Sequence, residues 1–116
     1  MENVLEDSPN ELISIVKGVN DPRFKLCLDI GHANITKNGI TMEEWTKAVL
    51  PYLGHVHLHN NHGWPDSHEM LGSGVMHIEQ LLRLIIEGAP EATLTLEIRD
   101  SCRSSVEWLI EKGFLS

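Results

Sequence analysis

Residues 54–74 read GHVHLHNNHGWPDSHEMLGSG and contain five of the protein's seven histidines. The segment opens with a histidine at every second position and then becomes a loop rich in Gly, Pro and Asn. Successive side chains of a strand point to opposite faces, so His55, His57 and His59 are expected on one face, and Val56 and Leu58 on the apolar one. Buried imidazoles are costly to desolvate, so this pattern favours a metal ion or converging carboxylates as their partners.

Helix and strand signals alternate on both sides of this segment. A buried strand is predicted at residues 24–29, and a further strand at residues 93–98. Capping boxes at residues 8–11 and 41–44 predict two helix starts, and Ser101 is predicted to cap the last helix. The residues expected to face the core are Leu12, Ile15, Val16 and Val19; Trp45, Ala48, Val49 and Tyr52; Ile78, Leu81, Leu82 and Ile85; and Val106, Leu109 and Ile110. This α/β order, in units of roughly thirty residues, favours a parallel sheet with outer helices, as in a (β/α)8 barrel.

Length, composition and charge narrow the class of protein. With 116 residues, 41% of them apolar, residues 1–116 are expected to form one domain. The chain has no run of about eighteen apolar residues and an acidic N-terminus, so we expect no membrane span, no signal peptide and a cytoplasmic protein. Cys27 and Cys102 make a poor disulfide framework, and Cys27 is expected as a buried apolar residue. A net charge of −8 makes nucleic acid an unlikely partner and favours a small molecule held through a cation.

Polar residues recur at the carboxyl ends of the predicted strands. Asp29, His57 and Glu97 each occupy such an end, and in α/β folds this edge faces the ligand site. Glu2 would add another carboxylate from a strand that precedes the first helix. Mixed carboxylate and imidazole ligands suit Zn²⁺, Mn²⁺, Fe²⁺ or Co²⁺.

Each of these residues also has a structural interpretation. An aspartate such as Asp29 at a strand end is more often a helix cap or turn former, and Glu97 can equally pair with Arg99 or Arg103. Loop, capping or packing positions are expected for His62, His77 and Trp64. The coincidence of several polar strand ends on one predicted edge favours a shared site.

Five segments together resemble the C-terminal half of the xylose isomerase-like TIM barrels. This superfamily includes sugar and sugar-phosphate isomerases and epimerases and the endonuclease IV enzymes of AP endonuclease family 2. The segments are Glu2-Asn3, Leu28-Asp29-Ile30-Gly31-His32, His55-Val56-His57-Leu58-His59-Asn60-Asn61, Asp66-Ser67-His68 with Leu71-Gly72 and Gly74, and Leu96-Glu97. The resemblance covers nearly the whole chain and implies a partial (β/α)8 TIM barrel, about half a barrel.

The resemblance also implies a ligand set. A divalent metal ion (Zn²⁺, Mn²⁺, Mg²⁺ or Co²⁺) would be held by Glu2, Asp29, His57 and Glu97. His32 would contact substrate or hold a second metal ion.

The loop after the histidine strand carries further expected site residues. In endonuclease IV-like members the positions matching Asp66 and His68 bind an additional zinc. Substrate contacts are expected from His59 and Asn61 as well as from His32. The family's usual His-Asp-Asn is here His59-Asn60-Asn61, which removes a carboxylate at Asn60.

Three functions are consistent with these residues. The first is metal-dependent isomerisation or epimerisation of a sugar, with Glu2 and Glu97 exchanging a proton through an enediolate and His32 steadying the oxyanion. The second is phosphodiester hydrolysis at a multi-zinc cluster, as in endonuclease IV. The third is a catalytically incomplete half barrel or metal-binding subunit. A half barrel would expose apolar edges and inner faces, so two copies are expected to associate and complete a barrel-like assembly.

Overall fold

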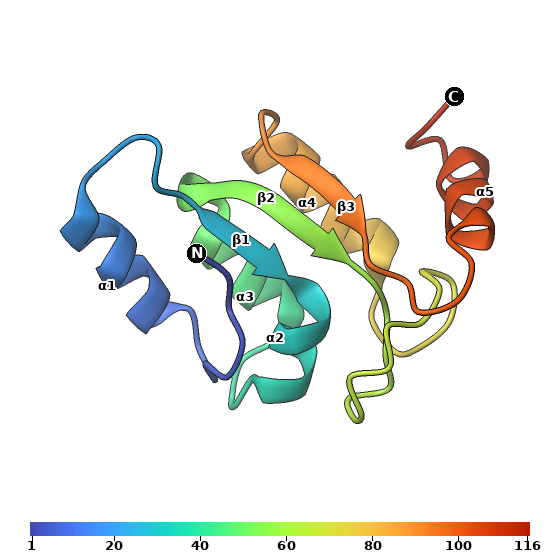
Figure 1. Cartoon of the computed structure of the whole chain (residues 1–116), viewed down its shortest axis with the longest axis horizontal. Helices are drawn as coiled ribbons and strands as arrows, with labels where there is room; N and C mark the ends of the chain where they lie inside the picture. The colour runs from blue at the N-terminus through green and yellow to red at the C-terminus, as the bar shows by residue number, and fades with distance from the viewer.

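Three parallel strands form the sheet of the computed structural model, which describes residues 1–116. They are β1 (Leu26–Asp29), β2 (Leu53–Leu58) and β3 (Thr93–Leu96), side by side in that order (Figure 1). Residues before the first helix add a fourth strand position, because Glu2 forms an isolated parallel bridge with Cys27 on the outer side of β1. The sheet therefore has one edge at the N-terminal segment and the other at β3.

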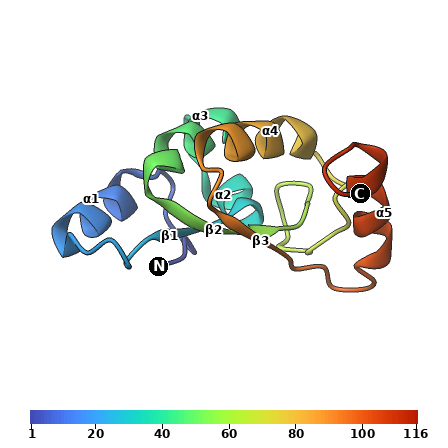
Figure 2. The same cartoon turned by 90° about the horizontal axis from the view of Figure 1, so that it is seen from above.

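Helices lie on one face of this sheet and beside its two edges (Figures 1 and 2). They are α1 (Asn10–Val19), α2 (Ile30–Thr36), α3 (Met42–Val49), the short 3-10 helix η1 (Leu50–Tyr52), α4 (Ile78–Gly88) and α5 (Arg103–Glu111). Figure 2 shows α2, α3 and α4 on the same side of the strands, whereas the opposite face is uncovered. This is the predicted α/β arrangement of a partial barrel, in which the uncovered face corresponds to the barrel interior.

The alternating residues of β2 lie on opposite faces of the sheet, as predicted. Val56 and Leu58 are fully buried against the helices, while His55 and His57 lie on the uncovered face. That face is polar, because β3 contributes Thr93 and Thr95 to it, and His55 contacts both threonine hydroxyls at 2.6 and 2.9 Å. The expectation of an apolar inner face is therefore wrong for these residues.

Two helix predictions are confirmed in detail. Thr41 and Glu44 form the capping box of α3 through reciprocal hydrogen bonds, and this places Trp45 in the core, fully buried. The predicted inward face of α4 is also buried throughout, at Ile78, Leu81, Leu82 and Ile85.

Other predictions are wrong at the level of local structure. The capping box at residues 8–11 does not form, because α1 begins at Asn10 with Pro9 at its N-cap and no side-chain cap. On that helix Ile15 and Val19 are exposed. Ser101 is not the N-cap residue of α5, which is Cys102, although its hydroxyl accepts a hydrogen bond from the Arg103 amide. Ile110 of this helix is half exposed.

Helix α2 begins directly at the end of β1 and is not indicated by the sequence pattern. The sequence Ile30-Gly31-His32 suggests only a turn, but the Asp29 carboxylate caps a seven-residue helix by accepting a hydrogen bond from the His32 amide at 2.8 Å. The cap interpretation of Asp29 is thus confirmed.

None of the helices combines the length and the apolar content that a membrane span requires.

The close contact between α2 and the loop after β2 can be tested at Gly31. A Cβ atom at this position would overlap the His59 ring, so we expect Gly31→Ala to lower the free energy of unfolding by about 1–3 kcal/mol. Gly18→Ala is the matched control, since no atom lies near its Cβ position on the exposed face of α1, and it should be neutral or stabilising by about 0.5–1 kcal/mol. Urea denaturation of the two variants would contradict this packing if they were equally stable.

Candidate metal centre

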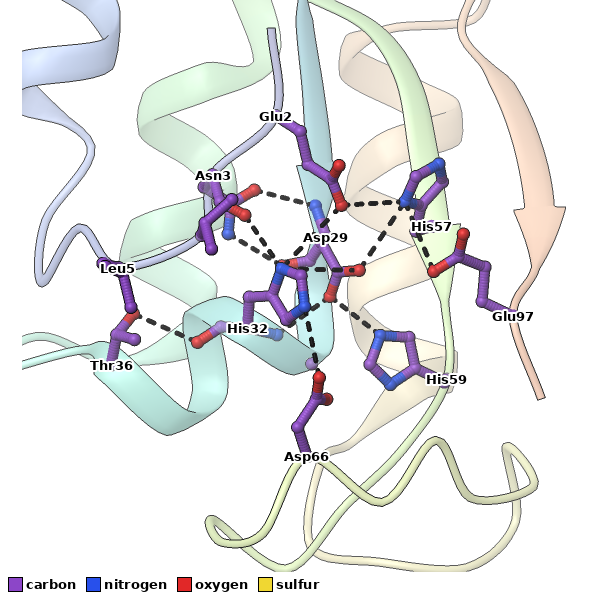
Figure 3. A network of polar contacts seen from close by, with 12 residues as sticks. Glu2, Asn3, Leu5, Asp29, His32, Thr36, His57, His59, Asp66 and Glu97 are labelled. Atoms are coloured by element: carbon purple, nitrogen blue, oxygen red, sulfur yellow. Dashed lines mark hydrogen bonds and ion pairs between the residues drawn. The ribbon is translucent and has the colours of Figure 1, made fainter. Parts of the chain in front are cut away.

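The parallel register of the sheet brings four predicted ligands to one edge. Asp29 at the end of β1 lies opposite His57 on β2, and Glu97 follows the last residue of β3, which pairs with Leu58. Glu2 reaches the same edge from the N-terminal segment. Figure 3 shows these four side chains pointing toward one another. This set (Glu2, Asp29, His57 and Glu97) is the candidate site for a metal ion, and the name metal centre refers to it below.

The Nδ1 atom of His57 lies in the middle of the metal centre. It is 3.1 Å from Glu2 Oε1, 3.6 Å from Asp29 Oδ2 and 3.5 Å from Glu97 Oε2. Three carboxylates gathered around one imidazole nitrogen repel one another unless a cation balances them. The arrangement therefore calls for a positive charge at this point.

The donor set fits a divalent metal ion. One ligand atom from each of Glu2, Asp29 and His57 lies within 4.8 Å of the other two. The Asp29 side chain is fully buried, yet its Oδ2 has no hydrogen-bond partner, and a buried unpaired carboxylate oxygen is costly. Carboxylate oxygens combined with one imidazole nitrogen suit Zn²⁺, Mn²⁺ or Co²⁺, and an oxygen-rich set also accepts Mg²⁺.

Asp29 is held in place through its other oxygen. Oδ1 accepts hydrogen bonds from the His32 amide and from His59 Nε2, both at 2.8 Å. Burial alone would raise the pKa of this carboxyl group, but the bonds from His59 and His32 outweigh it and hold the pKa below its ordinary value. Asp29 is therefore a carboxylate at neutral pH, with Oδ2 free to bind a cation.

Asn3 also positions the metal centre, and sequence reasoning assigns it no function. Its buried side chain donates to the Asp29 carbonyl at 2.9 Å and accepts from the Asp29 amide at 2.8 Å, as a neighbouring strand would. This tie keeps Glu2 beside Asp29. The only signal in the sequence is its position directly after Glu2.

His32 lies between the metal centre and the loop after β2. Its Nδ1 donates to the Asn3 carbonyl at 2.9 Å, and its Nε2 is 3.3 Å from Asp66 Oδ2. Burial lowers the pKa of His32, but the Asn3 carbonyl and the charges of Asp29, Asp66 and Glu2 raise it above its usual value.

His32, Asp66 and His68 form a second cluster that could hold a metal ion. His68 Nδ1 donates to the Glu97 carbonyl at 2.8 Å, while its Nε2 is 3.1 Å from Asp66 Oδ2. Both histidines thus use Nδ1 on a carbonyl and turn Nε2 toward the same carboxylate oxygen. A neutral imidazole that donates through Nδ1 has its lone pair on Nε2, so an ion between these two nitrogens and the Asp66 oxygen could bind all three atoms.

The expected substrate contacts differ in how they face solvent. His32 is partly accessible, but His59 and Asn61 are fully buried. Asn61 accepts from Asn34 at 2.7 Å and donates to the Gly31 carbonyl at 3.1 Å, so it fixes the start of α2. In this arrangement His59 and Asn61 support the site from beneath its rim.

The hydrogen bonds of Asn60 show why an amide replaces the family's usual aspartate at this position. Its buried Nδ2 donates to the carbonyls of Leu71 and Met76, and its Oδ1 accepts from the amides of Asn61 and Met76. A carboxylate cannot donate, so an amide is required here to hold the returning loop.

The remaining histidines and Cys27 lie outside both clusters. His62 is an exposed partner of Glu69, and His77 is the N-cap residue of α4 without a side-chain bond. Cys27 is only partly buried; burial and the charges of Glu2 and Asp29 raise the pKa of its thiol to about 11, so it stays protonated at neutral pH. Trp64 is exposed at the loop tip and does not pack on the site.

Comparison with known proteins finds relatives over nearly the whole chain. The chain is 31% identical over 104 residues to the uncharacterized protein MJ1311 of Methanocaldococcus jannaschii, and the match covers 87% of this chain and 36% of that protein. It is similar to the crystal structure of a D-tagatose 3-epimerase-like protein, with 26% identity, a TM-score of 0.81, and coverage of 96% of this chain and 45% of that one.

A second solved structure is the TTHB071 protein from Thermus thermophilus, soaked with ZnCl2. It shares 25% identity with a TM-score of 0.77, over 97% of this chain and 43% of that one. The chain thus spans less than half the length of each of these proteins. Residues 1–112 match the model of the family described as xylose isomerase-like TIM barrel. The chain belongs to the xylose isomerase-like TIM barrel family.

Proposed function

We propose that the chain carries the metal centre of a sugar or sugar-phosphate isomerase or epimerase. The observation that supports this most directly is the convergence of three carboxylates around His57 Nδ1 on the uncovered side of the sheet edge. The similarity to a D-tagatose 3-epimerase-like protein supports the same reaction class.

The proposed reaction moves a proton next to a carbonyl group. A bound divalent ion would polarise the carbonyl oxygen and so acidify the adjacent C–H bond. Glu2 and Glu97 flank His57. One of them would remove the proton to give an enediolate, and the other would return a proton. Return to the neighbouring carbon isomerises the sugar, and return to the opposite face of the same carbon epimerises it. His32, whose Nε2 faces the loop, would donate a hydrogen bond to the developing oxyanion.

The second candidate is phosphodiester hydrolysis at several zinc ions. It is favoured by the second cluster, where the Nε2 atoms of His32 and His68 both face Asp66 Oδ2 and the buried Asp66 Oδ1 has no hydrogen-bond partner. Two or more ions could clamp the attacking and leaving oxygens of a phosphodiester. The net charge of −8 disfavours nucleic acid as the substrate.

A third candidate is a metal-binding subunit that lacks activity alone. The metal centre lies on an uncovered sheet face, and the largest groove, about 640 Å³ between α4 and α5, includes none of its four residues. A substrate of ordinary size needs walls that enclose it. Those walls would come from a further part of the barrel.

We infer that a second copy of the chain supplies these walls. On the β3 side, a groove of about 310 Å³ is lined only by apolar residues, including the half-exposed Leu94. Helix α1 lies at the opposite edge of the sheet (Figure 1). Its Ile15 and Val19 are exposed. Four strand positions in each of two copies match the eight of a closed barrel.

Metal binding is tested first. Asp29→Asn keeps an oxygen for the His59 and His32 hydrogen bonds but puts an NH2 group where Oδ2 faces the metal centre. We expect one divalent ion per wild-type chain and a Kd more than about 100-fold weaker in Asp29→Asn, beyond the effect of losing an outer-shell contact. Calorimetric titration and elemental analysis measure this.

The control is Asp21→Asn, because Asp21 is paired only with the exposed Arg23. Equal affinity in both variants would contradict the assigned site. Two or three ions per chain would favour the multi-zinc hydrolase over the isomerase.

Proton transfer is tested by exchange with solvent. In D2O, metal-loaded protein should introduce deuterium at the carbon next to the carbonyl of an accepted ketose or aldose. Glu97→Gln should slow this exchange by at least about 100-fold, because an amide cannot act as acid or base. Glu91→Gln, in the exposed turn before β3, serves as the control. Absence of deuterium with every aldose and ketose offered would discard the isomerase proposal.

Association is tested by light scattering. We expect a dimer at about tens of micromolar, a range in which exposed apolar edges associate. Leu94→Lys introduces a charge into the apolar groove and should yield monomers, whereas Val75→Lys, at an exposed loop position, should not. A monomeric wild-type chain would rule out the second copy as the partner.

A further inference from the structure

His59 contacts the two clusters at the same time. Its side chain is fully buried, and its Nε2 donates to Asp29 Oδ1 at 2.8 Å. On its other side the imidazole ring is stacked on His68, with 3.9 Å between the ring centroids and 3° between the planes. The hydrogen bond leads to the metal centre and the stacked ring to the second cluster.

The space for this ring is provided by Gly31. Any side chain at this position of α2 would overlap the His59 ring. The missing Cβ therefore lets the ring lie between the start of α2 and the loop that carries His68.

His59 itself is a poor metal ligand. One atom each from His59, His68 and Glu97 lies within 4.8 Å of the others, which is close enough in distance for an ion. The lone pair of an imidazole nitrogen lies in the plane of its ring, however, and two rings stacked in parallel direct their lone pairs along separate planes. An ion between them would lie out of the plane of both rings, which is an unfavourable geometry for imidazole ligands. Nε2 of His59 is in addition occupied by Asp29.

We propose that His59 is a positioning residue that couples the two clusters. Its hydrogen bond fixes Asp29 Oδ1 and so aims Oδ2 at the metal centre. Its ring stacks on the His68 ring, and this contact helps to position the loop that carries Asp66 and His68. His59 thus serves both as the hydrogen-bond partner of Asp29 and as a contact that holds the loop.

The loop is tied to the end of the histidine strand by an antiparallel bridge between Asn60 and Glu69, and His68 adds contacts of its own. His68 Nδ1 donates to the Glu97 carbonyl, and the His68 carbonyl accepts from the Arg99 amide at 3.0 Å. These bonds tie His68 to the segment after β3, and the stack on His59 ties it to Asp29. The stack on His59 is thus one contact that connects the loop to the Asp29 carboxylate, beside the contact of Asp66 with His32.

Two substitutions separate the hydrogen bond from the stacked ring. His59→Gln can place an NH2 group near Nε2 and keep the bond to Asp29, but it removes the aromatic ring. His59→Phe keeps a ring beside His68 and removes the donor. The inference rests on the proposed metal centre, so Co²⁺ affinity is measured by competition titration, and loop order by hydrogen exchange of the Glu69 amide, which donates to Asn60.

We expect opposite effects in the two variants. His59→Phe should weaken Co²⁺ binding by about 10- to 100-fold, as for the loss of other outer-shell partners, and leave Glu69 exchange near the wild-type rate. His59→Gln should keep Co²⁺ affinity within about threefold and speed Glu69 exchange by about 2- to 10-fold, the effect of losing one aromatic pair. His77→Phe and His77→Gln, at an exposed histidine, control for the substitutions.

The outcomes distinguish this inference from the function proposed above. If the wild-type chain binds no Co²⁺, both are overturned. If it binds Co²⁺ and His59→Phe binds it equally well, the metal centre stands and the positioning residue does not. If both variants lower Co²⁺ affinity and speed exchange to the same extent, in step with a lower melting temperature, His59 is merely structural and the coupling is refuted.

Discussion

The metal centre depends on the two oxygens of Asp29 having different roles, one held by hydrogen bonds and the other free. Oδ1 is fixed by the His32 amide and by His59, and these bonds keep the carboxylate ionised although it is fully buried. Oδ2 has no hydrogen-bond partner and faces His57. A fully buried carboxylate with one oxygen secured and the other free is what a ligand needs before its ion arrives.

The same carboxylate links the fold to the site. Asp29 ends β1 and caps α2, so the turn between strand and helix is fixed by a residue that also faces the metal centre. Asn3 pairs with its backbone from the other side and brings Glu2 alongside. A substitution that moved Asp29 would therefore disturb the strand end, the helix start and the ligand set together.

Sequence patterns are sufficient for the elements whose packing is periodic. The alternation in β2 and the spacing of Ile78, Leu81, Leu82 and Ile85 report which face is buried, and the parallel order then implies that the ends of the strands converge. This is why Asp29, His57 and Glu97 can be grouped from the sequence without knowledge of any contact. Glu2 is added to this group as part of a strand expected before the first helix and through the family resemblance, although its only strand pairing is a single bridge with Cys27.

The parts that sequence reasoning misses depend on single contacts between distant segments. Helix α2 is short, and its start is set by the Asp29 cap, which looks in sequence like any strand-end aspartate. The burial of His59 requires the absence of a side chain at Gly31, far earlier in the chain, and no periodicity encodes such a pair. The polar character of the uncovered face is missed because threonine is favoured in strands on either face, so Thr93 and Thr95 do not indicate which way they point.

The position of His32 bears on which chemistry the scaffold supports. Its Nδ1 is committed to the Asn3 carbonyl, so only Nε2 remains for function. With a proton, Nε2 donates to an oxyanion and the site has the parts for isomerisation. Without one, Nε2 can join Asp66 and His68 as a ligand, and the site has the parts for multi-ion hydrolysis. The Asn3 carbonyl and the carboxylates around His32 outweigh its burial and raise its pKa, which favours the protonated form unless a second ion displaces the proton.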